Sequence, residues 1–254
     1  MYSTQKIVVT GCSFSTGMEM YDSHLTPFSN RAQRDAHILK WGKNNLKLSG
    51  MDIFKMKDIA FAEWESKERS VSWPALLETR SGIPVENLSR IGASVGHSLL
   101  SFSEYCSKKD TMDNVIAIHQ IPSIGRMELR IEPKNRVTVQ PANISGNFGY
   151  DKTYFEDAIN QTKNVFKERM QKPNYVEKHF EKIITRLHNI SSKNNVTSYY
   201  IVDSISSIPD CIKNNILIDD FTSFKEKYQK GTMGHPIDIK YNQDICDICL
   251  PILY

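Results

Sequence analysis

The sequence predicts a single doubly wound α/β domain, in which a five-stranded parallel sheet carries helices on both faces. Five short apolar runs occur along the 254 residues, and each has the form of a buried parallel strand. Segments long enough for a helix separate most of these runs, as the crossovers of a parallel sheet require. Hydrophobic residues make up 40% of the chain and charged residues 24%, which allows a large buried core and excludes a disordered chain.

The predicted strands begin with a β-branched run that Gly11 closes. The second strand follows the turn at Gly82 and Pro84, and the third ends at His119. Strands are expected over residues 6–10, 85–88, 114–119, 197–202 and 215–218.

Helices are expected in the segments between the strands. Trp73 and Pro74 mark the start of a helix that leads into the second strand, because proline is favourable in a first helical turn. Trp73 itself is expected in the core. The clearest amphipathic pattern places Phe180, Ile184 and Leu187 on one face of a later helix. Besides the helix at Trp73, helices are expected over 94–106, 173–190 and 242–250.

Two stretches, at about 22–70 and 126–170, interrupt this alternation. The first contains a cluster of cations between Arg31 and Lys47, which is expected to be a solvated surface. The second contains a short hairpin near 136–140, followed by a helix. Long insertions after strand ends tend to cover the active-site edge of such sheets, so both are interpreted as lid or specificity segments.

Charge, hydropathy and cysteine content exclude several classes of protein. Lys and Arg number 32 against 29 Asp and Glu, and a net charge of +3 does not indicate a nucleic-acid partner. No uninterrupted apolar stretch approaches the ~18 residues of a membrane span. Five scattered cysteines indicate free thiols in a reducing compartment, so a cytosolic protein is expected.

No metal or other cofactor is expected. The close pair Cys246 and Cys249 is expected in the core, because a zinc site needs a second ligand pair with the usual spacing. His179 and His188 lie on opposite faces of their predicted helix, since their separation advances the helix by about 900°.

The strongest chemical signal is the loop after the first strand, Gly11-Cys12-Ser13-Phe14-Ser15. A serine at the carboxyl end of a parallel strand places a hydroxyl in the crevice where α/β proteins bind ligands. It also lies near the start of a helix, whose N–H groups stabilise an anion. The alternative is that Ser13 and Ser15 cap that helix. Cys12 is expected to point into the core rather than to act as a nucleophile.

Three further segments support a site at the same edge of the sheet. Gly92 follows the second strand and lets the backbone come close to a ligand. Gln120 follows the third strand, with Arg126 shortly beyond it. His235 lies in a Gly/Pro turn before the last helix.

In this order, the four segments resemble the blocks of the SGNH (GDSL-type) hydrolase family, which contribute a serine, a glycine, an asparagine and a histidine. The resemblance spans nearly the whole chain and is closest to a divergent bacteriophage branch, where the first block reads Gly-Cys-Ser-Phe. It implies a flavodoxin-like three-layer α/β/α fold and the hydrolysis of esters. It also implies Ser13 as nucleophile and His235 as general base. The oxyanion hole would come from Ser13, Gly92 and Gln120.

Three positions depart from the family's pattern. Cys12 replaces an aspartate that normally braces the first block, and Gln120 replaces the asparagine of the third block but keeps a carboxamide. Thr232 replaces the aspartate that orients the catalytic histidine, so a backbone carbonyl or another carboxylate must take its place. Asp220 and Asp238 are the nearest candidates in sequence. This loss is expected to lower the rate rather than abolish it.

Two residues are expected to contact substrate. Arg126 would clamp a carboxylate or phosphate, with an ion pair to Glu128 as the alternative, and His119 ends the third strand beside Gln120. The expected function is a serine esterase that removes an acyl group from a carbohydrate or related small molecule, in the cytoplasm of the host cell if a phage encodes it. The alternative is a catalytically degraded binding or virion-associated phage protein. The oligomeric state is not indicated.

Overall fold

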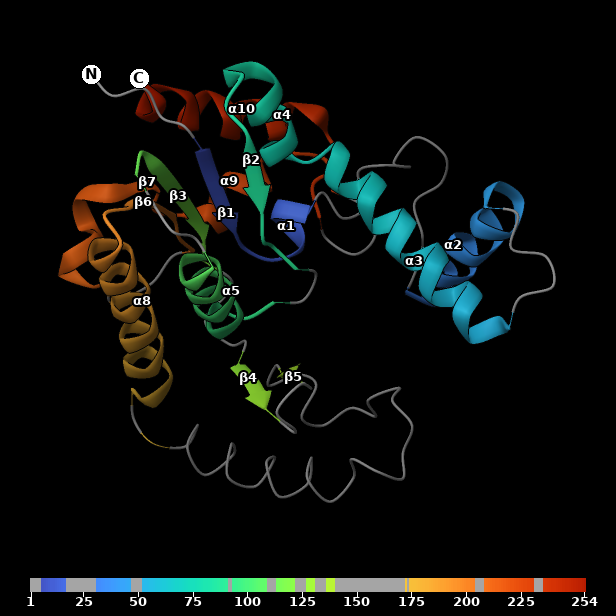
Figure 1. Cartoon of the computed structure of the whole chain (residues 1–254), viewed down its shortest axis with the longest axis horizontal. Coiled ribbons are helices and arrows are strands. Elements are labelled where there is room, and N and C mark those ends of the chain that lie inside the picture. The colour runs from blue at the N-terminus through green and yellow to red at the C-terminus, as the bar shows by residue number, and fades with distance from the viewer. Residues whose placement is uncertain are drawn as a thin grey trace.

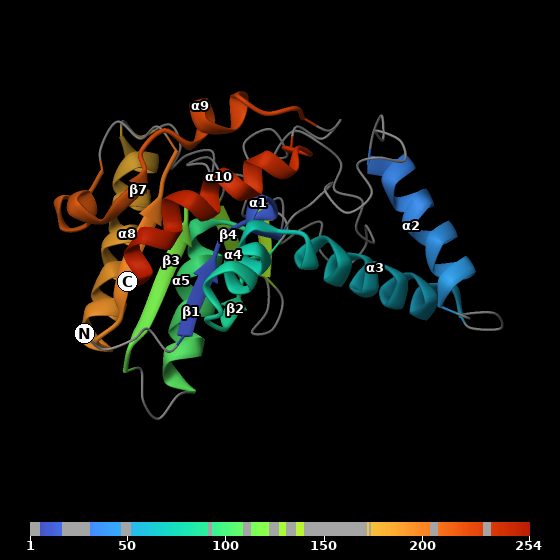
Figure 2. The same cartoon turned by 90° about the horizontal axis from the view of Figure 1, so that it is seen from above.

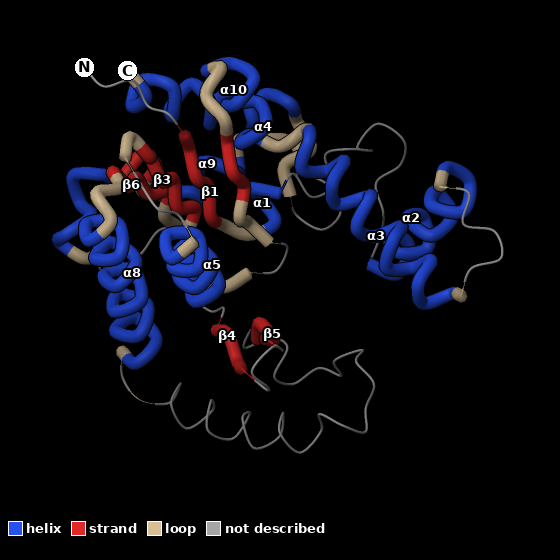
Figure 3. Tube along the Cα trace, viewed as in Figure 1, coloured by secondary structure: helices blue, strands red, loops and turns tan. Residues whose placement is uncertain are grey.

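A parallel sheet with helices on both faces forms the centre of the molecule (Figures 1 and 2). Figure 3 separates the two kinds of element by colour. The computed structural model describes residues 6–16, 31–46, 52–90, 93–108, 113–121, 127–130, 136–139, 172, 174–203, 208–230 and 235–254.

Among the described residues, five strands pair in parallel in the order β2-β1-β3-β6-β7. Counted along the chain, this is the order 2-1-3-4-5 of flavodoxin-like sheets. All five predicted strands are confirmed. The central β3 is buried along its whole length, which its apolar residues 115–118 predict and which extends to His119 and Gln120. The strands are β1 (Lys6–Thr10), β2 (Val85–Asn87), β3 (Val115–Gln120), β6 (Thr197–Ile201) and β7 (Ile216–Ile218).

Alternate residues of the central strands face two separate cores. Val8 and Ala117 pack on the side of α5 (Val95–Ser107) and α8 (Tyr175–Lys193). Ile7 and Ile118 pack on the side of α4 (Trp73–Ser81) and α10 (Ile239–Cys249). Figure 1 shows these two pairs of helices on opposite faces of the sheet. The four helices confirm the predicted ones to within a few residues at their ends.

Trp73 and the two close cysteines occupy the second of these cores, as predicted. Trp73, Cys246 and Cys249 are each fully buried, and the Cys246 thiol donates to the Trp73 carbonyl at 3.2 Å. Burial raises the pKa of the Cys246 thiol to about 12, so it stays protonated at neutral pH. All five cysteines of the chain are free thiols.

Several short elements connect the main ones. They are too brief for a hydrophobic period to reveal. The hairpin and a helix starting near Ser13 were predicted, and the other short elements were not. The predicted hairpin exists as an antiparallel pair of strands, while the helix expected after it lies outside the described residues. These elements are α1 (Ser13–Thr16), β4 (Met127–Arg130), β5 (Arg136–Val139), η1 (Asp210–Asn215), α9 (Phe221–Glu226) and η2 (Leu250–Leu253).

The first insertion forms a helical arm, composed of α2 (Arg31–Asn45) and α3 (Ile53–Ser70). Its two helices pack on each other and extend away from the sheet (Figures 1 and 2). They enclose a small core of their own, centred on Ile38, Ala60 and Trp64.

A buried ion pair crosses this small core. Arg34 donates from Nη2 to both carboxylate oxygens of Glu68, at 3.0 and 2.9 Å, and the Trp64 indole donates to the same carboxylate at 3.1 Å. Arg34 and Glu68 are 7% and 1% exposed. The expectation of a wholly solvated cationic surface is therefore wrong for Arg34, because its charge is neutralised inside the arm.

Removing Glu68 tests the importance of this pair. Glu68→Ala leaves the Arg34 guanidinium buried without its main partner, so we expect the free energy of unfolding of the arm to fall by about 3 kcal/mol. The measurement is hydrogen exchange of the α2 and α3 amides. Glu63→Ala, at an exposed position of the same helix, serves as the control, and equal effects of the two substitutions would contradict the prediction.

Candidate functional site

The loop after β1 lies between the loops that follow its two neighbours in the sheet, β2 and β3. It turns directly into α1, where the Ser15 N–H donates to the Cys12 carbonyl at 3.0 Å. Ser13 is the first residue of α1, and the position of its hydroxyl lies outside what the structure describes. Cys12 is 2% exposed, which confirms that it points into the core.

The Gln120 side chain binds this loop at two of its residues, Ser15 and Cys12. Its Oε1 accepts a hydrogen bond from the Ser15 hydroxyl, and its Nε2 lies 3.8 Å from the Cys12 Sγ. The residue ends β3 and is 1% exposed. The predicted oxyanion contact of Gln120 is therefore corrected to a bracing role, because both ends of its carboxamide are bound inside the loop. The Ser15 hydroxyl bonds to Gln120 instead of capping α1.

Gly11 is required by this close approach. A Cβ at this position would lie 2.5 Å from the Ser15 Oγ and 2.9 Å from the Gln120 Oε1. Real Cβ atoms do not approach so closely, so a larger residue would push the brace apart.

The loop after β2 is tied to the first loop at two points. The Asn87 Nδ2 donates to the Ser15 carbonyl at 2.9 Å, and the Arg90 N–H donates to the Gly11 carbonyl at 3.2 Å. The Asn87 Oδ1 also accepts from the Ser89 N–H at 3.0 Å. Asn87 was not predicted as a site residue, although its position at the last residue of a strand before a polar loop is a signal for such a role. Gly92 and Arg126 lie outside the described residues.

His235 meets the first loop from the other end of the chain. Its ring lies 4.9 Å from the Phe14 ring, centroid to centroid, at an angle of 48°, and the residue is 9% exposed. Phe14 is also in edge contact with Phe221 at 5.3 Å. The segment after His235 is fixed by a hydrogen bond, which the Ile237 N–H donates to the Gln229 carbonyl at 2.9 Å. The folded chain thus places the residue next to Ser13 against His235.

The two candidate carboxylates for orienting His235 cap helices. The Asp220 Oδ1 accepts from the Ser223 N–H at 2.9 Å at the start of α9, and this bonding lowers the pKa of Asp220. The Asp238 Oδ1 accepts from the Lys240 N–H at 2.9 Å at the start of α10. Capping is a sufficient reason for each residue at its position, and a role toward His235 stays a prediction.

His119 lies in the core on the α5 side of the sheet. Its Nδ1 is 2.9 Å from the Thr10 Oγ1, its Nε2 is 3.3 Å from the Ser198 Oγ, and its ring packs edge-on against Phe102. It is fully buried, and burial, aided by the nearby His188, lowers its pKa to about 3. The expected contact of His119 with substrate is corrected, because a neutral imidazole bonded on both nitrogens inside the core does not reach a site.

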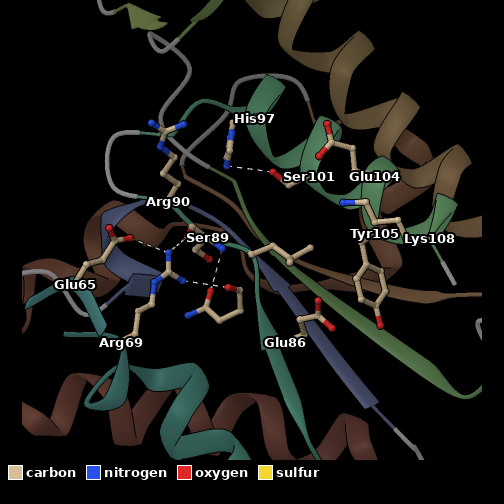
Figure 4. Close-up of a pocket in the computed structure, with 12 residues that line it drawn as sticks. Glu65, Arg69, Glu86, Ser89, Arg90, His97, Ser101, Glu104, Tyr105 and Lys108 are labelled. Carbon is tan, nitrogen blue, oxygen red and sulfur yellow. Dashed lines mark hydrogen bonds and ion pairs between the residues drawn. The ribbon is translucent and has the colours of Figure 1, made fainter. Parts of the chain in front are cut away.

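A groove with a volume of about 520 Å³ runs beside the loop after β2 (Figure 4). The end of α3 forms one wall with Glu65 and Arg69, and α5 forms the other with His97 and Ser101. Residues 86–90 form its floor. Side chains of both charge signs line it, so neither charge sign dominates the groove.

Neither a metal-binding cluster nor a membrane-spanning helix is found in the described part of the chain. No three His, Cys, Asp or Glu side chains there group closely enough to bind a metal ion. None of the helices in that part combines the length and the apolar character that crossing a membrane requires.

The described contacts join the Gln120 and His235 segments to the loop after Gly11, through Ser15 and Phe14 respectively. Asn87 and Arg90, which precede Gly92, bond to the same loop. Comparisons with protein-family models, with curated proteins and with solved structures found no match.

Gly11→Ala tests the brace. We expect it to lower the free energy of unfolding by about 2 kcal/mol through overpacking. The nearest clash is with the Ser15 hydroxyl, so the double variant Gly11→Ala/Ser15→Ala should be less destabilised than the sum of the two single variants. Urea unfolding followed by circular dichroism measures all three, and strict additivity would contradict the described contact.

The pKa of His119 predicts a dependence of stability on pH. Its folded-state pKa of about 3 lies below the ordinary histidine pKa of 6.5, so only the unfolded chain binds the proton between these two pH values. The free energy of unfolding should fall as pH falls from about 6.5 toward 3, by at most about 1.4 kcal/mol per pH unit from this group. His119→Asn should flatten that slope in urea titrations carried out between pH 3 and 6.5. An unchanged slope in His119→Asn would show that His119 does not cause the pH dependence of stability.

Proposed function

We propose that the protein is a serine ester hydrolase that resembles the SGNH family, with Ser13 as nucleophile and His235 as general base. The observation that carries the proposal is the contact between Phe14, next to Ser13, and the His235 ring at 4.9 Å. This contact joins the first and last blocks, which come from opposite ends of the chain, at the carboxyl edge of a parallel sheet. Ligand sites of open α/β sheets lie at that edge.

In this mechanism the Ser13 hydroxyl attacks the ester carbonyl while His235 accepts its proton. The negative charge on the carbonyl oxygen is stabilised by the backbone N–H groups of Ser13 and Gly92. His235 then returns the proton to the departing alcohol, which leaves an acyl-enzyme on Ser13. Water, deprotonated by His235, hydrolyses that intermediate.

The Phe14 contact compensates in part for the aspartate that Thr232 replaces. An imidazole needs a fixed ring orientation to accept a proton from the nucleophile. Packing against Phe14 at one face and burial to 9% exposure restrict rotation of the His235 ring. A hydrogen bond that the ring N–H donates to a backbone carbonyl, or to Asp220 or Asp238, would set its tautomer. The absence of a dedicated aspartate predicts a modest rate.

The proposed substrate is an acyl ester of a carbohydrate or a related small molecule. What supports a hydroxyl-rich alcohol is the groove beside the loop after β2, where most of the lining side chains are polar or charged. Arg126 is proposed to bind an anionic group of the substrate. The proposed setting is the cytoplasm of a phage-infected cell.

A second candidate is a binding or virion-associated phage protein with degraded catalysis. Two observations favour it. The Gln120 carboxamide is bound inside the loop, and the two nearest candidate carboxylates cap helices. The carboxamide and the carboxylates that would complete a catalytic site are thus all bound in structural roles.

Hydrolysis of p-nitrophenyl acetate separates the two candidates. For an esterase, Ser13→Ala and His235→Ala should each lower kcat/KM by about 10³-fold. Ser70→Ala, at an exposed end of α3, should leave the rate unchanged. A fluorophosphonate probe should label the wild type at Ser13 and leave Ser13→Ala unlabelled. Equal background rates in wild type and Ser13→Ala, with no labelling, would favour the binding protein.

A further inference from the structure

We infer that Arg69, in the helical arm, is a positioning residue. It holds the loop after β2 against the loop after β1, residues 11–15, which carries the proposed nucleophile Ser13 and is called the nucleophile loop below. The inference rests on the proposed function, because it assigns Arg69 to the support of that site. Arg69 lies in the last turn of α3, within the first insertion and far in sequence from both loops.

The guanidinium of Arg69 binds two carbonyls of one loop. Nη1 donates to the Asn87 carbonyl at 3.1 Å, and Nη2 donates to the Ser89 carbonyl. Nη2 also donates to the Glu65 carboxylate at 2.9 Å, one helical turn earlier in α3. Figure 4 shows the guanidinium between Glu65 and the backbone of the loop. This arrangement uses the planar fork of arginine, since one point charge does not reach both carbonyls and the carboxylate in the same geometry.

The opposite side of the same loop is bound to the nucleophile loop. Asn87 donates through its side chain to the Ser15 carbonyl at 2.9 Å, and the Arg90 N–H donates to the Gly11 carbonyl at 3.2 Å. Residues 87–90 therefore lie between Arg69 and the segment that begins α1. These bonds hold the first turn of α1, which begins at Ser13, and the Ser13 N–H is proposed to stabilise the oxyanion. Misplacing such a donor by a small distance is costly in rate.

Arg69 also covers the free edge of the sheet. β2 is an edge strand, and the Leu88 N–H donates inward to the Val9 carbonyl at 2.8 Å. Successive residues of a strand point their backbone groups to opposite sides, so the carbonyls of Asn87 and Ser89 face outward, where an unpaired edge invites association. The two roles make different predictions. Positioning changes kcat, whereas edge covering alone changes only self-association.

The first experiment compares Arg69→Ala, Arg69→Lys and Arg80→Ala in hydrolysis of p-nitrophenyl acetate. Arg80 is the matched control, because it also ends a helix and forms a surface ion pair, with Asp247 at 2.7 Å, away from the loops. We expect Arg69→Ala to lower kcat by about 10-fold to 100-fold with KM changed less than about twofold. Free guanidinium should restore part of the lost rate, Arg69→Lys should be intermediate, and Arg80→Ala should match the wild type.

The second experiment does not depend on activity. Hydrogen exchange of the Ser89 and Arg90 amides should become at least about tenfold faster in Arg69→Ala, while exchange of the β3 amides stays unchanged. This readout keeps the inference testable if the wild type proves to hydrolyse no ester, an outcome that would reject the proposed function alone.

Two results would overturn the inference. One is an unchanged kcat in Arg69→Ala accompanied by self-association in gel filtration, which would assign Arg69 to edge covering only. The other is unchanged exchange of the Ser89 and Arg90 amides, which would show that the loop holds its place without the guanidinium.

Discussion

The Ser15 hydroxyl donates a hydrogen bond to the Gln120 carboxamide in the space that a side chain at position 11 would occupy. This contact joins the ends of two central strands, β1 and β3. It also fixes the first turn of α1, whose carbonyl at Ser15 then accepts from Asn87. The loop after β2 and His235 both contact the turn that this hydrogen bond fixes. A glycine is needed there because only a missing Cβ lets the loop and the carboxamide approach so closely.

Strand alternation gives neighbouring polar residues different roles. His119 and Gln120 are adjacent at the end of β3, yet their side chains point to opposite faces of the sheet. His119 faces α5, where Thr10 and Ser198 bind its ring and burial keeps it neutral. Gln120 faces the loop after β1 and bonds to Ser15. Polarity at a strand end is thus a sign of hydrogen bonding, and the face on which a residue lies decides whether that bonding stabilises the core or a loop.

The helical arm changes the interpretation of the first insertion. The cations between Arg31 and Lys47 suggested a solvated lid surface, but Arg34 is bound to Glu68 inside the arm. Arg69, at the end of the arm, is bound to the loop after β2. The sequence does not reveal which group a charged residue binds, because the partner lies on another element. Arg34 of α2 binds Glu68 of α3, and Arg69 of α3 binds the Asn87 carbonyl of β2. The α2 and α3 helices were not predicted for a related reason. Their apolar faces are narrow and pack mainly on each other, so the hydrophobic period is weak.

Apolar runs and their spacing were sufficient to predict the parallel sheet, its main helices and the core positions of Trp73, Cys246 and Cys249. These features depend on local burial, which a chain encodes residue by residue. The order of loops at strand ends also predicted that the segments of Gly11, Gln120 and His235 would lie together, and Ser15 bonds to Gln120 while Phe14 contacts His235. The tertiary structure alone decided which polar groups there are already bound: Gln120 to Ser15, Asp220 and Asp238 to helix N-termini, and Arg69 to Asn87 and Ser89. A hydrogen bond is satisfied by whichever partner the fold brings within about 3 Å, and that partner is set by the packing of distant segments.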